Sequence, residues 1–249
     1  MDILFSFSSS GLILTALVFI WTGFVRSGLG FGGAALGLPL MLFILDQPLF
    51  WLPVIGFHLL FFSALTLGSR LKRVDWVYLK KAMTIIIPFT LVGVFGLIKL
   101  PTDWLVLFIY IITLFYAVLW IFGLNLHSSN QWFDRLLLSI GGYVAGTSLT
   151  GAPLIVAVFM RNVSADLLRN TLFVLWFLIV SIKMTAFVVV GIELNVLVAL
   201  ALLPVAAIGH FAGLKAHEYI LQNDALFKRF TGVFLCVISG LGLLRLWLV

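Results

Sequence analysis

Long apolar runs separated by short polar breaks are the dominant pattern along this chain. Runs of about 20 residues, the length that a helix needs to cross a bilayer, recur from one end of the sequence to the other. The pattern predicts an all-α polytopic membrane protein. We expect apolar helical segments at about 10–25, 28–45, 49–68, 82–99, 103–124, 135–149, 151–161, 167–190, 194–214 and 226–248.

A polar linker, NLHSSNQWFD at residues 125–134, divides the chain into two halves of similar length. The segment IIIPFTLVGVFGLIK, which ends at Lys99, parallels ALLPVAAIGHFAGLK, which ends at Lys215, and both contain the pattern Pro-x4-Gly. Similarity at a spacing of about half the chain indicates an internal duplication. We therefore predict one integral membrane domain, with a first repeat at 1–124 and a second at 135–249.

A glycine-rich stretch lies near the start of each half. The first is GFVRSGLGFGGAALGLP at residues 23–39, and the second is its degenerate copy GYVAGTSLTGAP at residues 142–153. Each stretch interrupts an apolar run, and glycine weakens a helix by about 1 kcal/mol relative to alanine. We expect a helical hairpin at each place.

Basic residues in the loops indicate how the repeats are oriented, because lysine and arginine mark the cytoplasmic side. The loop at 46–48 has none and the loop at 69–81 has five, whereas the equivalent loops of the second half have two (Arg161, Arg169) and, around Glu193, none. Equivalent loops therefore face opposite sides, which is typical of inverted-topology repeats. Each repeat would consist of a glycine-rich helical hairpin plus about three transmembrane helices, with both termini outside.

Composition supports the membrane class and excludes others. Hydrophobic residues make up 63% of the chain, charged residues 10%, and the mean hydropathy is +1.24. The net charge of +6 does not indicate nucleic-acid binding, because the basic residues lie in short loops. Cys236 lies in an apolar helix and cannot form an internal disulfide. The opening MDILFSFSSSGLIL has no basic start, which argues against a cleaved signal peptide.

The first hairpin contains the strongest candidate for a ligand-binding residue. Arg26 lies between the two apolar arms, and an arginine at bilayer depth costs about 2.5 to 3.5 kcal/mol on insertion scales. In transporters, interrupted helices direct backbone N–H groups and positive dipole ends toward an anion. Candidate binding groups here are Arg26, Ser27, Gly30, Gly32 and Gly33, with the glycines allowing a turn and close approach of a ligand.

The second hairpin offers hydroxyl groups where the first has glycine. Its candidates are Thr147, Ser148, Thr150 and Gly151. An oxyanion needs several converging donors and one positive charge, and the two hairpins together supply both. The alternative is that the glycines only allow tight helix packing, although packing does not account for Arg26.

Three other ionisable residues are expected at membrane depth: His58, Lys183 and His210. Such residues often mark transport pathways, but they also occur as hydrogen-bonded or snorkelling side chains. Lys183 is the strongest candidate for a second substrate-binding cation, because it lies far from both ends of an uncharged span. Since no Asp or Glu falls in mid-span, proton coupling would depend on His58 or His210.

Several familiar site types are absent from the sequence. Gly28, Gly30 and Gly33 fit the spelling of a dinucleotide fingerprint, but the strand-turn-helix setting that this fingerprint requires is missing. Phosphate-binding GKS or GKT sequences and metal-spaced Cys/His clusters are missing as well. We expect no cofactor, no metal and no nucleic-acid partner.

These residues resemble the sulfite exporter TauE/SafE family of the toluene sulfonate uptake permease group. The family has a G-[FI]-G-G-G motif followed by a proline, here GFGGA at 30–34 and Pro39; a loop similar to R-x-G-x-V-D-W, here RLKRVDW at 70–76; and a second glycine motif, here TGAP at 150–153. Ala34 and Arg73 replace family glycines. The resemblance covers nearly the whole chain and implies sulfite, sulfonates or related sulfur anions as substrates.

The resemblance implies a secondary transporter, not an enzyme, that exports sulfite or sulfonates such as sulfoacetate across the bacterial inner membrane. Its partners would be a small anion and the lipid bilayer, with a homodimer left open. Two alternatives remain at this stage. One is an uptake carrier or channel for another small oxyanion. The other is an intramembrane serine hydrolase with Ser148 as nucleophile and His210 as base, because residues 146–149 read Gly-Thr-Ser-Leu.

Overall fold

The computed structural model describes residues 8–68, 70–124, 126 and 130–248. The described residues form ten α-helices and one short 3-10 helix, with no strand. Residues 1–7, on which part of the expectation about a signal peptide rests, and residues 125 and 127–129 of the predicted linker lie outside the described part. The helices are α2 (Ser9–Leu29), α3 (Gly33–Ile44), α4 (Pro48–Leu67), η1 (Leu71–Arg73), α5 (Trp76–Lys99), α6 (Thr102–Ile121), α7 (Gln131–Ser148), α8 (Ala152–Asn162), α9 (Ala165–Val190), α10 (Val196–Gln222) and α11 (Asp224–Leu248).

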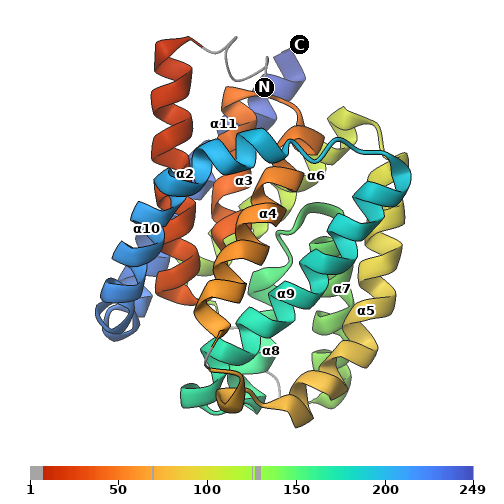
Figure 1. The fold of residues 1–249 in the computed structure, drawn as a ribbon, viewed down its shortest axis with the longest axis vertical. Coiled ribbons are helices and arrows are strands. Elements are labelled where there is room, and N and C mark those ends of the chain that lie inside the picture. Colours follow the sequence, from red (N-terminus) through yellow and green to blue (C-terminus); the bar gives the residue numbers. More distant parts are fainter. Residues whose placement is uncertain (1–7, 69, 125, 127–129, 249) are drawn as a thin grey trace.

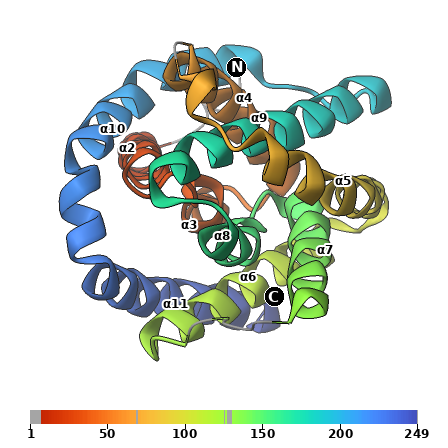
Figure 2. The same cartoon turned by 90° about the horizontal axis from the view of Figure 1, so that it is seen from below.

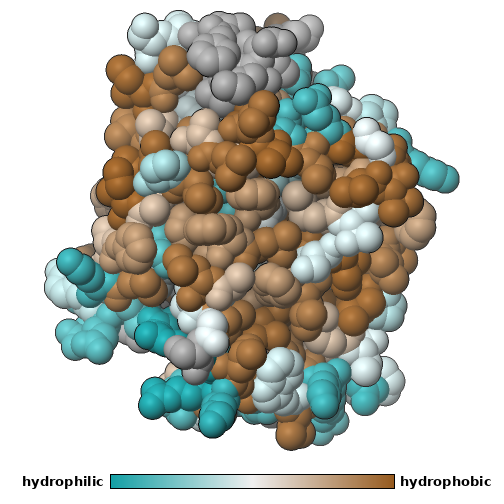
Figure 3. Space-filling view, in the orientation of Figure 1, coloured by the Kyte–Doolittle hydropathy of each residue, from teal (hydrophilic) through white to brown (hydrophobic). Residues whose placement is uncertain are grey.

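Seven of these helices are long and apolar enough to cross a membrane: α2, α4, α5, α6, α9, α10 and α11. Two shorter apolar helices, α3 and α8, have 12 and 11 residues. Hydrophobic side chains cover most of the face shown in Figure 3, and hydrophilic ones gather mainly toward its lower edge. A water-soluble protein would not expose so large an apolar surface. The predicted all-α multi-pass membrane protein is confirmed.

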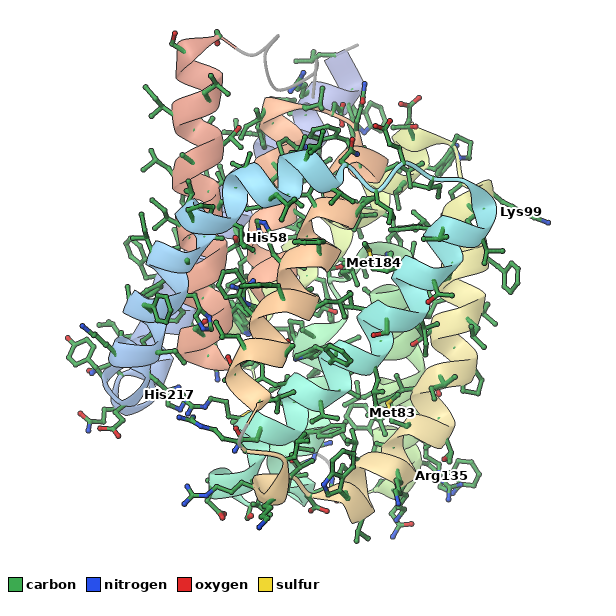
Figure 4. The ribbon with its side chains drawn as sticks, in the orientation of Figure 1. His58, Met83, Lys99, Arg135, Met184 and His217 are labelled. Carbon is green, nitrogen blue, oxygen red and sulfur yellow. The ribbon has the colours of Figure 1, made fainter. Side chains whose placement is uncertain are left out.

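The two ends of the molecule differ in charge. Figure 1 places the first turn of α2, the last turn of α11 and the connection between α9 and α10 at the upper end, and the connection between α4 and α5 at the lower end. The lower connection carries Arg70, Lys72 and Arg73. Figure 4 shows Arg135 at the lower end as well, whereas Lys99 projects from the upper end. The positive-inside rule predicts that the lower end is the cytoplasmic one.

The glycine-rich stretches form two helical hairpins, α2–α3 and α7–α8. In the first, the prediction that Arg26 and Ser27 lie between the arms was wrong, because both belong to the last turns of α2. The chain turns at Gly30 and Gly32, whose φ angles of +79° and +85° suit only glycine without strain. A left-handed glycine directly after the helix is a common way for a helix to end.

Some expected boundaries also move. α5 begins at Trp76 and not near 82, and α10 continues to Gln222 and not only to about 214. The side chain of Asp75 caps α5 by accepting a hydrogen bond from the backbone N–H of Tyr78. α7 begins at Gln131, so the last residues of the expected linker are helical. These helices extend beyond their apolar spans, and their terminal turns carry polar side chains. The apolar pattern therefore predicted helices that were too short at these ends.

Each hairpin packs its first helix against a long helix of the other half. α2 packs along α10, and α7 packs along α5. The shared Pro-x4-Gly pattern lies at these contacts: a Cβ atom at Gly93 would overlap the carbonyl oxygen of Tyr143, and one at Gly209 would overlap that of Ile20. Only glycine permits such close approach between helix backbones.

The matching packing of the two halves is what an internal duplication would produce. α6 packs against α11, and α4 against α9, so equivalent helices also pair with each other. Figure 2 shows α3 and α8 in the middle of the molecule, with the long helices around them. The inverted relation of the repeats and their limits at 1–124 and 135–249 stay predictions, with this packing as support.

Candidate functional site

A small cavity lies where the tips of the two hairpins meet. Its volume is about 20 Å³, which is room for about one water molecule. From the first hairpin it is lined by Arg26 and residues 31–34, and from the second by Ala145, Leu149 and Ala152. α4 and α9 complete the wall. The structure therefore brings both glycine-rich stretches to one place, although more than 100 residues separate them in the chain.

Arg26 is the only charged residue that lines this cavity among the described residues. Its side chain is 4% exposed, and its Nε and Nη2 atoms have no hydrogen-bond partner in the described protein. Within the described part of the chain, the one ion pair joins Arg161 to Asp134, so no carboxylate neutralises Arg26. Its guanidinium carbon lies 4.3 Å from the centre of the Phe62 ring. That contact contributes about 2 kcal/mol when desolvated, which is less than the several kcal/mol that burial of a charge costs.

The first turns of α3 and α8 point at the same cavity. Neither helix has a side-chain cap: the capping residues are Gly32 and Gly151. The first backbone N–H groups of a helix have no partner within it and carry a partial positive charge. Gly33, Ala34 and Ala152, at the starts of these helices, line the cavity. Two helix N-termini and one guanidinium thus make the cavity electropositive.

The sequence analysis named Arg26, Gly32 and Gly33 among the residues that line this cavity and missed the others, of which Trp176 and Leu149 have unusual features. Trp176 of α9 is buried, and its indole Nε1–H has no partner in the described protein. Leu149 ends α7 with a φ of +60°, a left-handed conformation that leucine rarely adopts. A tryptophan in an apolar span resembles a core residue, so nothing in the sequence distinguished it. Leu149 occupies the position that Gly30 occupies in the first hairpin. This correspondence could have identified Leu149 from the sequence.

Ser27 does not face the cavity. It is fully buried, and its Oγ lies 2.5 Å from Nδ1 of His210 on α10. The His210 ring in turn lies 4.6 Å from the Phe62 ring, on which Arg26 also rests. Arg26, Phe62, His210 and Ser27 are thus in sequential contact. A proton on His210 would place a second cation close to Arg26.

The hydroxyl groups of the second hairpin are engaged within the protein. Thr147 donates to the carbonyl oxygens of Tyr143 and Gly93, at 2.9 and 3.2 Å. Ser148 donates to Val144 O at 3.1 Å, and its Oγ lies 2.6 Å from Oγ1 of Thr150. Since Ser148 uses its hydrogen on Val144, Thr150 is the donor in that pair. These hydroxyls stabilise the turn in this conformation.

Lys183 and His217 satisfy carbonyl groups at the ends of the two hairpin helices. Nζ of Lys183 lies 2.8 Å from Gly146 O and 3.0 Å from Thr147 O, in the last turn of α7. Nδ1 of His217, labelled in Figure 4, lies 2.5 Å from Gly28 O in the last turn of α2. The last carbonyls of a helix have no intrahelical partner, and cations stabilise them. Lys183 is fully buried and is not among the residues that line the cavity.

His58 lies apart from the cavity wall. Its Nε2 donates to Ala199 O at 2.7 Å and so joins α4 to α10. The ring also meets Phe19 of α2 edge to face, with 5.1 Å between ring centres. These contacts give His58 a packing role in this conformation, and its part in proton coupling stays a prediction.

The glycines divide into two groups by what surrounds them. Gly30 and Gly32 have positive φ angles and make the turn. Gly151 has an ordinary φ of −70°, and a Cβ atom there would overlap Gly141 O in α7. The packing alternative therefore accounts for Gly151, whereas turn geometry accounts for Gly30 and Gly32.

The geometry does not favour the hydrolase alternative. Ser148 has its contacts within the second hairpin, whereas the hydroxyl partner of His210 is Ser27. A nucleophilic serine must lie within hydrogen-bond reach of its base. The described residues also contain no group of three or more His, Cys, Asp or Glu that could hold a metal ion.

Comparison with known proteins identifies one family. The model of the family described as "Sulfite exporter TauE/SafE" matches residues 15–242, which is most of the chain. The match includes both hairpins and every residue that lines the small cavity. No curated protein and no solved structure matches the chain.

Proposed function

Because this chain belongs to the sulfite exporter TauE/SafE family, we propose that it exports sulfite or a small organosulfonate such as sulfoacetate through the Arg26 cavity. Family membership implies a multi-pass cell-membrane transporter of small sulfur-containing anions, and not an enzyme. The substrate, the direction and the residues that bind the anion are the proposal.

One observation carries it: the guanidinium of Arg26 is buried, without a carboxylate, beside a cavity. A buried charge without a counter-ion is costly, and an anion in the cavity would remove that cost. Arginine suits this task because its planar fork donates two parallel hydrogen bonds to two oxygens of one oxyanion. The third oxygen of a sulfite or sulfonate group then needs other donors.

Candidates for those donors line the same cavity as Arg26. The first N–H groups of α3 carry no side-chain cap, and neither does that of Ala152 in α8, where Pro153 has no N–H to donate. Helix N-termini bind oxyanions in many proteins. The indole N–H of Trp176 offers one neutral donor more. Phe31, Phe173 and Ile179 form the apolar part of the wall, which suits the carbon end of an organosulfonate.

The structure represents a closed state, because a cavity of about 20 Å³ does not hold a sulfite ion. Transport requires the two hairpins to separate, first toward one side of the membrane and then toward the other. Rigid-body movement of one repeat against the other is the usual way for such folds to do this. The first turns of α3 and α8 would widen the cavity by moving apart.

Substitutions at Arg26 test the proposal directly. Arg26→Lys keeps the charge but loses the fork, so we expect binding of sulfoacetate to weaken by more than tenfold, which is about 1.4 kcal/mol. Arg26→Ala should weaken it further. Trp176→Phe removes one neutral donor and should weaken binding by about 0.5 to 1.5 kcal/mol. Thr150→Ala should weaken binding by a similar amount if the hydroxyl of Thr150 is free in the opened state. Binding is measured by isothermal calorimetry on purified protein.

Matched controls separate binding from folding. Trp21 also has a buried indole N–H without a partner, but it does not line the cavity. Trp21→Phe should therefore leave affinity unchanged. If folded Arg26→Ala binds sulfite and sulfoacetate as well as the parent does, the anion site lies elsewhere, and Lys183 becomes the next candidate.

Transport in proteoliposomes identifies the substrate and direction. Efflux and uptake of radiolabelled sulfite are compared with those of sulfoacetate, taurine and sulfate. We expect sulfite or sulfoacetate to be carried at the highest rate and taurine, which carries an additional ammonium group, at a lower one. A preference for sulfate would contradict the proposal that sulfite or a small organosulfonate is the substrate.

A further inference from the structure

A second, larger cavity lies between the cytoplasmic parts of α6, α8 and α11. Its volume is about 700 Å³. It is lined by Trp120 and its neighbours at the end of α6, by residues 153, 156, 157, 160 and 161 of α8, and by residues 225, 228 and 229 of α11. Figure 2 shows these three helices next to one another in the view from below. The cavity is large enough for a small organic anion with its hydration water.

The charged residues among the described lining of this cavity are basic. They are Arg161, Lys228 and Arg229, and none of the described lining residues is a carboxylate. Arg161 is held by Asp134 and by Leu126 O, so it is already paired. Lys228 is half-buried and Arg229 is exposed, which places them at the mouth. A basic mouth with apolar walls concentrates small anions.

Tyr116 of α6 lines the larger cavity. Its side chain is 2% exposed, and its buried hydroxyl has no partner in the described protein. A buried hydroxyl without a partner is uncommon in proteins, and among the described lining residues Tyr116 is the one that has it.

One aromatic residue belongs to the walls of both cavities. Phe31 lines both of them. The adjacent residues Ala152 and Pro153 line the smaller and the larger cavity respectively. Phe31 lies between Gly30 and Gly32, both with positive φ. Two neighbouring glycines can absorb backbone rotation, so the ring can move without displacing α2 or α3.

We infer that the larger cavity is the cytoplasmic vestibule for the transported anion, and that Phe31 is the gate between this vestibule and the Arg26 cavity. The inference rests on the proposed function, since it takes the Arg26 cavity as the transport site. The vestibule admits small sulfonates and inorganic oxyanions and disfavours cations. With Phe31 as it lies here, the two cavities are separate.

Cysteine labelling tests the vestibule without requiring transport. In a Cys236→Ser background, Ala157→Cys places a thiol in the vestibule wall. In inside-out vesicles we compare the reaction rate of a sulfonate-bearing methanethiosulfonate with that of a trimethylammonium-bearing one. We expect the anionic reagent to react severalfold faster than the cationic one. The double variant Lys228→Gln, Arg229→Gln should remove this preference. Lys81→Gln, an exposed cation at the same end that does not line the cavity, should leave it intact.

A second thiol tests the gate. Ala34→Cys lines only the smaller cavity and should not react from the cytoplasmic side while Phe31 is present. Phe31→Ala should open access and raise the rate by at least about tenfold, whereas Phe31→Trp should keep the thiol protected. If Phe31→Ala does not give a monodisperse protein, Phe31→Leu replaces it in the same experiment. Phe95→Ala, on a lipid-facing position that is 66% exposed, is the matched control.

The outcomes separate this inference from the proposed function. Equal preference for both reagents at Ala157→Cys overturns the vestibule, and labelling of Ala34→Cys that does not depend on Phe31 overturns the gate. Protection of Ala157→Cys by phosphatidylglycerol in the vesicles, without protection by sulfoacetate, means that the cavity holds a lipid headgroup, which overturns the vestibule too. Each of these results is compatible with weaker sulfoacetate binding by Arg26→Ala, so the vestibule or the gate can fail while the proposed function stands. Conversely, Arg26→Ala can bind sulfoacetate normally while the expected labelling is observed, and then only the proposed function fails.

Discussion

Two buried cations near the hairpin tips have opposite surroundings. Nζ of Lys183 donates to two carbonyl oxygens at the end of α7, whereas Nε and Nη2 of Arg26 have no partner in the described protein. Both residues interrupt apolar spans in the sequence, where Arg26 was the first candidate for binding the anion and Lys183 the second. The contacts favour Arg26 as the anion ligand and Lys183 as the residue that holds the second hairpin.

Replacement of Lys183 by methionine should therefore lower stability more than affinity. Lys183→Met leaves two buried carbonyl groups without their donor, which costs about 1 to 3 kcal/mol. We expect a lower midpoint of thermal unfolding in detergent, with sulfoacetate affinity of the folded fraction changed less than by Arg26→Lys. Lys99→Met, at the upper end of the molecule in Figure 4, should not change the midpoint. A stable Lys183→Met that has lost binding would make Lys183 a substrate ligand.

At the scale of helices, close contact between backbones fixes the position of each hairpin. Gly93 and Gly146 bring α5 and α7 together, and Gly23 and Gly209 do the same for α2 and α10. Within a membrane such packing replaces the hydrophobic effect as the main source of association. The hairpin tips meet at the Arg26 cavity because their first helices are fixed in this way.

Gly146→Ala tests this packing with a single methyl group. The added Cβ would overlap Thr90 O on α5, so α7 would have to shift. We expect a clear loss of stability, of about 1 to 3 kcal/mol as for other overpacked sites, and reduced transport because α7 carries one side of the cavity. The matched control is Gly240→Ala in α11, where nothing lies within 4 Å of the added atom. That change should be neutral or stabilising, since alanine is the better helix former. If both variants behave alike, the close contact of α5 and α7 does not contribute.

At the scale of the whole molecule, the duplicated halves and the charge of the loops predict inverted topology. The basic connection between α4 and α5 lies at the lower end of Figure 1, and the connection between α9 and α10 lies at the upper end. Two halves inserted in opposite directions place one hairpin on each side of the membrane. Inverted repeats would therefore give the Arg26 cavity equivalent routes of access from the two sides.

Single cysteines in a Cys236→Ser background test the orientation. Lys72→Cys and Gln222→Cys should react with an impermeant reagent from the cytoplasmic side, and Gln47→Cys and Glu193→Cys from the opposite side. The four side chains are exposed in the structure, so lack of access does not explain a difference. Reaction of positions 72 and 193 from the same side would show that the repeats are not inverted.

Membrane potential should drive export. The candidate spans lack a carboxylate in mid-span, so a carboxylate proton relay has no residues to use. A negative interior favours exit of an anion by about 2.3 kcal/mol per charge per 100 mV. We expect efflux of sulfoacetate from proteoliposomes to accelerate as the interior is made more negative at constant pH.

Proton coupling through histidine would give the opposite result. Transport that is indifferent to potential, yet abolished by a protonophore at a clamped potential, would contradict the expectation. His210 would then be the first residue to examine, because it contacts both Ser27 and the ring on which Arg26 rests. His210→Gln should remove the coupling in that case, and His58→Gln should not.

The sequence by itself determined the membrane class and the two glycine-rich hairpins, and it identified Arg26 as the first candidate for the anion, which stays a prediction. These features depend on local quantities: the length of an apolar run, the φ angles that glycine allows, and the cost of a charge within a span. Each can be evaluated without knowledge of neighbouring helices. The family resemblance, on the motifs at 30–34, 70–76 and 150–153, was confirmed by the match over residues 15–242.

Only the tertiary structure decided which side chains share the cavity. Helix rotation and packing between distant segments determine where a side chain points, and apolar spans that are hydrophobic all round give no periodicity from which to infer it. For this reason Trp176 was missed, and Ser27 was assigned to the anion although its partner is His210 on α10. The hydroxyl of Thr147, likewise, donates to Gly93 O, which becomes its neighbour only when α5 and α7 are in contact.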